Sequence, residues 1–376
     1  MMTSEERREV RYQRRKARRL AKRQERQRAF EDVFTFDNLY EAYRLCCRGV
    51  MWKASTQVYK ANAMLNIHNT KKRLLSGKYK HRGFTVFHIN ERGKPRKIQA
   101  SHISDRVVQR CLCDHCMVPQ MSPTWIYDNS ASQKGKGMDF SLNRLDAHLH
   151  RHYRKHGASG YILQIDFKDF FGSLCHATAF REIDRNIFDP RLNALAKAHL
   201  TCYGDHGVGL GAMPSQTIAI ATPNRLDHFI KEQLRIKGYG RYMDDSYLIH
   251  EDKEYLKECL IRIQAFCAEL GITISDRKTK IIKLTKGFKF LKIRFRLTDS
   301  GAVIRKPNRK GISRMRRKLR VFRRWVSEQR MTYRDVENAV ASWRGGMIRS
   351  RAYWAVFNMT RYFKYLFREE IKSCIA

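Results

Sequence analysis

The sequence predicts an α+β fold, in which a small antiparallel sheet is backed by helices. Two segments alternate apolar and polar residues around a turn, as β-hairpins do: 84–99 and 238–250. Long stretches between them place apolar residues at the three-to-four spacing of helices. After Pro307 the chain becomes basic and helical. Together these features favour a sheet covered by helices, followed by a helical C-terminal part.

Charge is the strongest compositional feature of the 376-residue chain. Lys and Arg number 76 against 36 Asp and Glu, which gives a formal net charge of +40. Such an excess repels itself in a compact chain and usually persists because a polyanion neutralises it. Nucleic acid is therefore the expected partner. A membrane-surface role is disfavoured, because no amphipathic apolar anchor accompanies the basic residues.

Hydrophobic residues make up 43% of the chain, which indicates a folded protein. No apolar run is long enough to cross a bilayer, and the N-terminus lacks the apolar core of a secretory signal. We therefore expect a cytoplasmic protein with reduced cysteines. Cys111, Cys113 and Cys116 raise the alternative of a zinc site, but no well-spaced second ligand pair follows them. We expect these three cysteines to pack on a helix.

The first half of the chain begins with a basic segment, 1–30, that lacks Gly and Pro and suits an exposed helix. This helix is either a solvated tail or a clamp on RNA phosphates, and both readings stay open. Residues 34–69 have helical spacing, and 84–99 predict a hairpin that turns at 91–94. The elements expected next are a helix over 104–118, a Gly/Ser-rich loop over 130–137 and a helix over 140–156.

The second half is expected to begin with a buried strand over 161–167, after the break at Gly160. A hairpin turning at 243–245 and helices after Pro307 are its other strong signals. The elements expected between these are a helix over 192–203, a Gly-rich loop over 204–216, a helix over 215–236, a helix over 252–270 and short strands over 272–296.

Three carboxylates suggest a chemistry. Asp166 lies in the buried-looking strand, where an ionised side chain is expensive without a compensating partner. Asp244 and Asp245 stand side by side at a hairpin tip, where like charges repel. A cation shared by the tip and the strand resolves both anomalies. Transfer of a nucleotide needs such an arrangement, with two Mg²⁺ ions about 4 Å apart on carboxylate ligands.

An ordered series of motifs around these residues resembles reverse transcriptases. The first, second and third motifs read QIDFKDFFGS, GLGAMPSQTIAIATPNRLDHFIK and RYMDDSYLIH. Upstream, KPRKIQASHISDRVVQRCL resembles the fingers motif and NSASQKGKGMDF the loop after it; SDRKTKI and KGFKFLKIRF resemble the closing motifs. A Tyr-x-Asp-Asp string alone arises by chance, but the series runs in order from about Phe36 onward and is specific.

The resemblance implies a right-hand polymerase with an antiparallel palm sheet and a helical thumb. It implies a basic helical extension over 1–32, fingers over 33–160, a palm over 161–296 and a thumb over 297–376. No segment beyond the thumb remains for a nuclease or RNase H domain, so a role in intron mobility is not expected.

The resemblance also implies metal ligands. Asp166 and Asp244 would bind two Mg²⁺ ions, for which Mn²⁺ is an expected substitute. Asp245 would lie nearby, and the carbonyl of Phe167 would complete a site.

Other residues match nucleotide-binding positions of the family. Phe171 matches the aromatic ring that crowds a ribose 2′-hydroxyl and so favours dNTPs. Lys94 and Arg96 match the fingertip cations that grip triphosphate oxygens. Lys278 matches a lysine beside the departing pyrophosphate, where it could donate a proton. For each of these cations, the alternative is a solvated surface charge.

The second motif contributes Leu210, Gly211 and Gln216, and it departs from the intron-type pattern Gln-Gly-x-x-x-Ser-Pro. Its Leu-Gly…Ser-Gln form is more similar to enzymes of diversity-generating retroelements and to some phage-defence reverse transcriptases. Leu210 would replace a polar side chain that touches the incoming nucleotide. Lys292 stands where a Gly is usual in the closing motif.

The expected function is RNA-directed DNA synthesis on a dedicated structured RNA, with dNTPs and an RNA–DNA hybrid as further partners. A role in phage defence or a related stand-alone retroelement is slightly favoured over diversity generation, which would usually add a small basic accessory protein. Three rivals stay open: a maturase-like RNA-binding protein, an RNA-dependent RNA polymerase and an RNA-binding scaffold. Phe171 speaks against the second of these.

Overall fold

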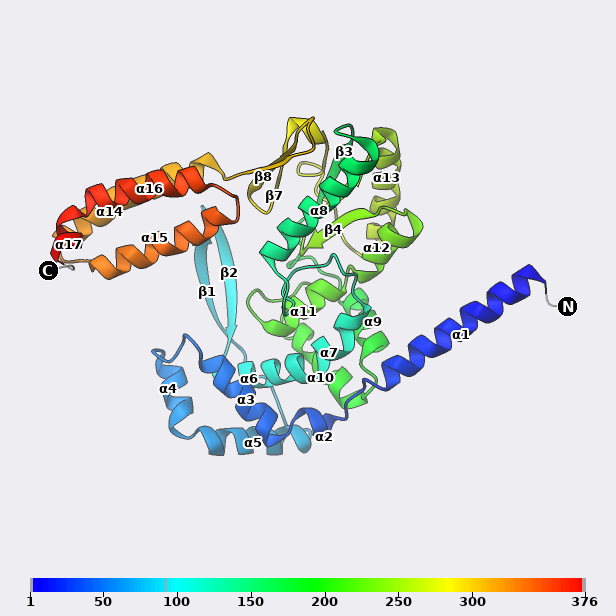
Figure 1. Ribbon diagram of the computed structural model, residues 1–376. Coiled ribbons are helices and arrows are strands. Elements are labelled where there is room, and N and C mark those ends of the chain that lie inside the picture. The colour runs from blue at the N-terminus through cyan, green and yellow to red at the C-terminus, as the bar shows by residue number, and fades with distance from the viewer. Residues whose placement is uncertain (1–2, 92, 374–376) are drawn as a thin grey trace. The chain divides into compact units, whose positions relative to one another are not determined.

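The computed structural model of the protein describes residues 3–91 and 93–373. Its chain divides into two compact units, each assembled from three segments of the sequence. The first unit comprises Met1–Ser132, Asp166–Arg235 and Leu260–Ser275. The second unit comprises Gln133–Ile165, Ile236–Cys259 and Asp276–Ala376. Figure 1 shows the helices and strands of both units and labels most of them.

The first unit begins with five helices. They are α1 (Ser4–Gln24), α2 (Phe30–Val33), α3 (Phe36–Cys47), α4 (Ala54–Ala61) and α5 (Ala63–Leu75). A capping box starts α1, because the Thr3 hydroxyl accepts from the amide of Glu6 while the Glu6 carboxylate accepts from the amide of Thr3. No residue of α1 is buried, so the predicted exposed basic helix is confirmed.

A two-stranded hairpin follows, formed by β1 (Phe84–Glu91) and β2 (Lys94–Ser101). The strands are antiparallel, and Ile89 pairs with Arg96. The hairpin confirms the prediction over 84–99, although Arg92 of the predicted turn lies outside the described residues. Gly93 adopts a φ of 85°, a left-handed conformation that costs glycine little.

The remaining helices of the first unit surround an apolar centre. They are α6 (Ile103–Leu112), η1 (Cys113–Met117), α7 (Val118–Met121), η2 (Ser122–Thr124), α9 (His176–Asn186), α10 (Pro190–Thr201), α11 (Met213–Ala221), α12 (Asn224–His228) and η3 (Phe229–Gln233). The helix predicted over 104–118 thus continues as a π-helix, η1, and α9 was not predicted.

The three cysteines weighed as zinc ligands are packing residues. Cys111, Cys113 and Cys116 are completely buried on α6 and η1. The Cys111 thiol donates to the carbonyl of Val33 at 3.2 Å. Burial raises the pKa of all three thiols, that of Cys116 to about 12, so they stay protonated and poor metal ligands. The predicted packing on a helix is confirmed.

The second unit contains a four-stranded sheet in the order β4-β5-β3-β6. Its strands are β3 (Tyr161–Asp166), β4 (Gly238–Tyr242), β5 (Asp245–His250) and β6 (Lys280–Lys283). The pairs β4–β5 and β3–β6 are antiparallel. A second sheet, β7-β8-β9, is also antiparallel and is formed by β7 (Phe288–Phe290), β8 (Ile293–Leu297) and β9 (Val303–Lys306). The predicted strands and antiparallel pairing are confirmed.

One hydrophobic core joins these two sheets to α8 (Met138–His156). Leu142, Leu145 and Leu149 of α8 are completely buried in it, at the three-to-four spacing of one helical face. Arg305 of β9 is buried as well and forms a two-pronged ion pair with Asp146 of α8, at 3.1 and 2.7 Å. The pair compensates both buried charges and ties the second sheet to the helix.

The C-terminal helices of the second unit form a separate cluster. They are α14 (Arg309–Ser327), α15 (Tyr333–Ile348), α16 (Tyr353–Leu366) and α17 (Arg368–Ser373). Their core includes Leu319, Val336 and Phe367, all completely buried. The basic helices predicted after Pro307 are therefore confirmed. A last helix, α13 (Lys253–Glu269), belongs in part to each unit.

Over 3–91 and 93–373, every helix is too short or too polar to traverse a lipid bilayer.

Gly240 makes the β4–β5 pairing sterically specific. It lies directly opposite Tyr247 in the strand register, and a Cβ at this position would lie 2.7 Å from the Tyr247 hydroxyl oxygen. Tyr247 is buried, and its hydroxyl is held 3.0 Å from Nδ1 of His148. The ring therefore covers the glycine and has little freedom to move away.

We expect Gly240→Ala to lower the free energy of unfolding by about 1–3 kcal/mol, the usual effect of overpacking. Gly345→Ala is the matched control, because Gly345 lies within α15 and its added Cβ meets nothing within 4 Å. The control should be neutral or stabilising by up to about 1 kcal/mol. Urea unfolding followed by circular dichroism measures both, and equal effects would refute the steric account.

Candidate active site

The tip of the β4–β5 hairpin carries two adjacent carboxylates. Tyr242 pairs with Asp245, which leaves Met243 and Asp244 as a two-residue loop. Met243 has a φ of 54°, an unusual conformation for a residue with a side chain and one that often marks functional turns. The completely buried Arg241 supports it by donating from its guanidinium to the carbonyl of Met243 at 3.1 Å. Both aspartates remain partly exposed.

The neighbouring strand in the sheet, β3, ends with the third carboxylate. The hydroxyl of Ser246, the second residue of β5, donates to the carbonyl of Ile165 at 3.4 Å. Asp245 precedes Ser246 in the chain, and Asp166 follows Ile165. The sheet thus aligns the start of β5 with the end of β3, the two strand ends that carry the predicted metal ligands.

Backbone hydrogen bonds hold the turn after β3 and leave one carbonyl unused. The amide of Ser275 donates to the carbonyl of Asp166, and the amide of Lys168 donates to the carbonyl of Thr273, both at 2.8 Å. The carbonyl of Phe167 between them accepts no hydrogen bond from any described residue. Since Phe167 is buried, this oxygen is an available ligand for a cation.

The same turn places Phe171 beside the Gly-rich loop. The Phe171 ring packs edge-to-face on Phe170, with 5.6 Å between centroids, and remains partly exposed. Its carbonyl accepts from the amide of Val208 at 2.7 Å. Gly207 fits tightly in this join: its φ is 76°, and an added Cβ would lie 2.5 Å from the carbonyl oxygen of Gly172. The first motif is therefore in contact with the residues that lead into the second motif.

A buried histidine strengthens this join. His176 at the start of α9 lies with its Nε2 2.7 Å from the carbonyl oxygen of Gly207. We did not predict roles for His176, Gly207, Arg241 or Ser246. The contacts of His176, Gly207 and Ser246 are distant in sequence, and the burial of Arg241 depends on tertiary packing. Only the run of glycines in 204–216 signalled that close backbone packing was needed.

The second motif continues into a cavity of about 530 Å³ within the first unit. Leu210 and Gly211 line it, and Gly211 has a φ of 101° that favours glycine. The base of β2 and three cations complete the wall; the cations are Lys53, Arg106 and Arg110. Gln216, in the first turn of α11, accepts from the hydroxyl of Ser132 at 3.3 Å. The structure thus joins the second motif to the loop predicted over 130–137.

Two of the three predicted cations, Arg96 and Lys278, occupy exposed positions. Arg96 lies in the middle of β2, and its side chain is exposed. Lys94 begins β2, but its side chain lies outside the described part of the chain. Lys278 is exposed in the turn before β6, in the second unit. Their roles at a nucleotide stay predictions.

Among the residues that the structure describes, no three His, Cys, Asp or Glu side chains form a ready-made metal cluster. Mg²⁺ does not need one, because it keeps several waters and is commonly bound by one or two carboxylates plus substrate phosphates. The ligands available on Asp166, Asp244, Asp245 and Phe167 are all oxygens. This donor set suits Mg²⁺ or Mn²⁺ rather than a metal that prefers nitrogen or sulfur.

The chain belongs to the reverse transcriptase family. The family model described as reverse transcriptase (RNA-dependent DNA polymerase) matches residues 79–295, more than half of the chain. The description of the family names RNA-dependent DNA synthesis, which is a nucleotidyl-transfer reaction. The right-hand polymerase fold class that the resemblance implied is confirmed. No curated protein matches the chain.

Several solved telomerase structures are similar to the chain at low identity. Apo telomerase from Candida tropicalis truncated from its C-terminal domain has 14% identity and a TM-score of 0.44, and the match covers 59% of this chain and 55% of that one. Telomerase from Candida albicans in complex with a TWJ fragment of telomeric RNA has 12% identity and a TM-score of 0.47, and the match covers 78% of this chain and 55% of that one. Apo telomerase from Candida tropicalis has 11% identity and a TM-score of 0.44, and the match covers 62% of this chain and 51% of that one. The chain spans about half the length of these telomerase chains.

We expect Gly207→Ala to reduce primer extension by about a hundredfold, because its Cβ would push the loop that leads into the second motif away from the backbone of Phe171 and Gly172. Gly204→Ala is the control: it lies in the same loop with a φ of 112°, yet its Cβ would meet nothing within 4 Å. Both variants bear the strain of a positive φ, but only the first has the clash. Steady-state kinetics with dTTP would distinguish them, and equal losses would contradict the proposed contact.

Proposed function

We propose that the chain copies RNA into DNA by two-metal nucleotidyl transfer at Asp166, Asp244 and Asp245. The observation that supports this most is the alignment of β5 with β3 through the bond from Ser246 to Ile165. Two strand ends that bear carboxylates become neighbours in one sheet. Such a pair is stable when divalent cations neutralise it.

The proposed ligands of two Mg²⁺ ions are Asp166 and Asp244, with Asp245 nearby and the unused carbonyl of Phe167 completing one site. Bound there, the ions would lower the pKa of the primer 3′-hydroxyl and neutralise charge on the phosphates. Lys94 and Arg96 bind the triphosphate oxygens of the incoming nucleotide. Lys278 donates a proton to the departing pyrophosphate.

Phe171 is the residue proposed to distinguish the deoxyribose of a dNTP from the ribose of an NTP. Its backbone carbonyl is hydrogen-bonded to the loop that leads to Leu210 and Gly211. In this proposal a nucleotide held by this loop and by Gln216 meets the Phe171 ring with its ribose. A bulky ring leaves room for the hydrogen of a deoxyribose and none for a 2′-hydroxyl.

We further propose the domain assignment of a right hand, with fingers over 33–160, a palm over 161–296 and a thumb over 297–376, after a basic extension over 1–32. An RNA–DNA hybrid would be gripped through its phosphates, as the net charge of +40 suggests. The affinity for nucleic acid should therefore fall steeply with salt.

The biological role that we favour is copying of a dedicated structured RNA in phage defence or a related stand-alone bacterial retroelement. The Leu210-Gly211 form of the second motif supports this lineage and equally allows diversity generation, with its small accessory protein. A maturase-like role is the third candidate, and it would not require the grouping of the three aspartates.

Asp244→Asn should abolish Mg²⁺-dependent primer extension, by about a thousandfold or more, because it removes a charged metal ligand and little volume. RNA affinity and the unfolding midpoint should stay near wild type. The control Asp252→Asn removes the same charge just after β5, where the Asp252 carboxylate accepts from the amide of Glu254 at 2.8 Å. Asparagine caps helices equally well. Full activity of Asp244→Asn would favour the maturase-like alternative.

Phe171→Ala should let ribonucleotides in, so that the ratio of kcat/KM for dTTP over UTP falls by about tenfold to a hundredfold. This ratio should fall because kcat/KM for UTP rises, since the smaller side chain leaves room for the 2′-hydroxyl. Phe188→Ala, which truncates an exposed ring, should leave the ratio unchanged. An unaltered ratio in Phe171→Ala would contradict the proposal that Phe171 selects deoxyribose over ribose.

A further inference from the structure

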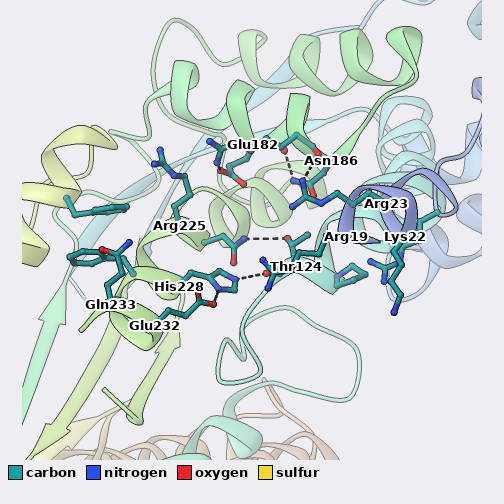
Figure 2. Close-up of a pocket in the computed structure, with 16 residues that line it drawn as sticks. Arg19, Lys22, Arg23, Thr124, Glu182, Asn186, Arg225, His228, Glu232 and Gln233 are labelled. Carbon is teal, nitrogen blue, oxygen red and sulfur yellow. Dashed lines mark hydrogen bonds and ion pairs between the residues drawn. The ribbon is translucent and has the colours of Figure 1, made fainter. Parts of the chain in front are cut away.

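The first unit contains a second pocket, of about 570 Å³, between the C-terminal part of α1 and the helices α9, α12 and η3. Figure 2 shows Arg19, Lys22 and Arg23 of α1 on one side and Arg225, His228 and Glu232 on the other. The volume lies in the range of small-ligand sites. None of the residues predicted for catalysis lines it.

Positive charge dominates this α1 pocket. Six Lys and Arg line it against two Glu: Arg19, Lys22, Arg23, Arg26, Arg185 and Arg225 against Glu182 and Glu232. Both acids are already paired, Glu182 with Arg185 at 2.8 Å and Glu232 with His228 at 2.7 Å. Burial lowers the pKa of His228, but hydrogen bonds with Thr124 and Glu232 outweigh this and raise it. The pocket therefore suits an anion.

Two side chains, one in α1 and one just after it, hold the helix in place. Arg23 donates to the carbonyl of Arg185 at 3.5 Å, and Gln27 donates to the carbonyl of Asn186 at 3.0 Å. The side chains of Arg19, Lys22 and Arg26 have no ion-pair or hydrogen-bond partner anywhere in 3–91 and 93–373. These three cations remain available to a ligand.

The pocket also contains acceptors that lack a donor. Asn186 and Asn224 are 3% and 7% exposed, and the side-chain oxygen of each has no hydrogen-bond partner among the described residues. Their amide nitrogens are used, by the carbonyl of Glu182 and the hydroxyl of Thr124. A buried acceptor left without a donor is destabilising by about 1–3 kcal/mol. A phosphodiester or another anion without a proton cannot supply that donor, whereas a ribose hydroxyl or a base N–H can.

An apolar wall accompanies these polar groups. Phe229 and Phe266 stack in the lining, with centroids 4.6 Å apart and an interplanar angle of 15°. Aromatic surface, cations and buried amide acceptors together match the base, phosphate and sugar of a nucleotide.

The exposed cations of α1 continue beyond the pocket along one helical face. They recur at intervals of three or four residues, and the set is Arg8, Arg11, Arg15, Arg19, Lys22 and Arg26. From Arg8 to Lys22 the helix rises by about 21 Å. That distance matches about six nucleotides stacked at 3.4 Å and exceeds the size of a free nucleotide.

We infer that the α1 pocket seats one nucleotide of an RNA strand whose neighbouring phosphates lie along the cationic face of α1. This inference rests on the proposed function only in taking RNA as the partner. It assigns a binding site apart from the residues proposed to handle primer and dNTP.

The first test measures binding of the full-length protein to a fluorescein-labelled, single-stranded 20-nucleotide RNA of mixed sequence as a function of salt. Arg19→Gln/Arg26→Gln should bind about tenfold more weakly, and the log–log salt slope should shrink by about 1.4, or about 0.7 per lost phosphate contact. The control Arg7→Gln/Arg14→Gln removes the same charge from another side of α1. Equal losses in both double variants would overturn the pocket and leave only a diffuse electrostatic effect.

The second test removes an acceptor without changing charge. Asn224→Leu should weaken RNA binding by about threefold to tenfold and leave the salt slope unchanged, because no phosphate contact is lost. A DNA strand of the same sequence should bind wild-type protein more weakly, since it lacks the 2′-hydroxyl. Unchanged RNA affinity in Asn224→Leu, or DNA binding equal to RNA, would overturn the assignment. Tighter binding of free UMP than of the 20-nucleotide RNA would also overturn the assignment, because it would mean that the pocket binds a free nucleotide.

Primer extension on preannealed oligo(dT)–poly(rA) separates this inference from the proposed function. At saturating template, the Arg19→Gln/Arg26→Gln protein should extend primers at the wild-type rate. Wild-type protein that extends primers but binds RNA independently of the pocket would refute only the inference. Wild-type protein that extends no primer would refute the proposed function, whatever the pocket binds.

Discussion

Two strands that lead to aspartates, β3 and β5, are neighbours in one sheet, and hydrogen bonds and packing determine their positions. The register of β4 and β5 determines which residues form the loop at Asp244, and the buried Arg241 supports that loop. Gly240 under Tyr247 makes the register specific, since a one-residue slip would drive a side chain into the ring. Neighbouring carboxylates repel each other, so the sheet must hold them by hydrogen bonds and packing until a cation neutralises them.

The first unit contains several of the residues that we propose to surround a nucleotide. Its turn after β3 joins the Gly-rich loop through the bond from Val208 to Phe171, so the positions of Phe171 and of the loop before the second motif depend on one another. The unit also carries the cationic face of α1. A chain with 76 Lys and Arg is less self-repulsive once phosphates lie along such faces.

Local patterns predicted much of the fold. Both hairpins and the basic helices after Pro307 were predictable because alternation, turn glycines and helical spacing act over a few residues. The π-helical turn at Cys113 and helix α9 were not, because tertiary packing decides them. For the same reason the sequence could suggest three aspartates as ligands but not the support from Arg241 and Ser246. The α1 pocket was invisible, since its lining comes from segments far apart in the chain.

The central claim is that Asp166 and Asp244 share divalent cations. The most direct test titrates Mn²⁺ by electron paramagnetic resonance into the protein with an RNA template, a dideoxy-terminated primer and the next dNTP. The account predicts two bound Mn²⁺ ions in the wild type, as two-metal transfer requires, and weakened binding of both ions in Asp166→Asn and in Asp244→Asn alike. Wild-type Mn²⁺ binding in either variant would contradict it.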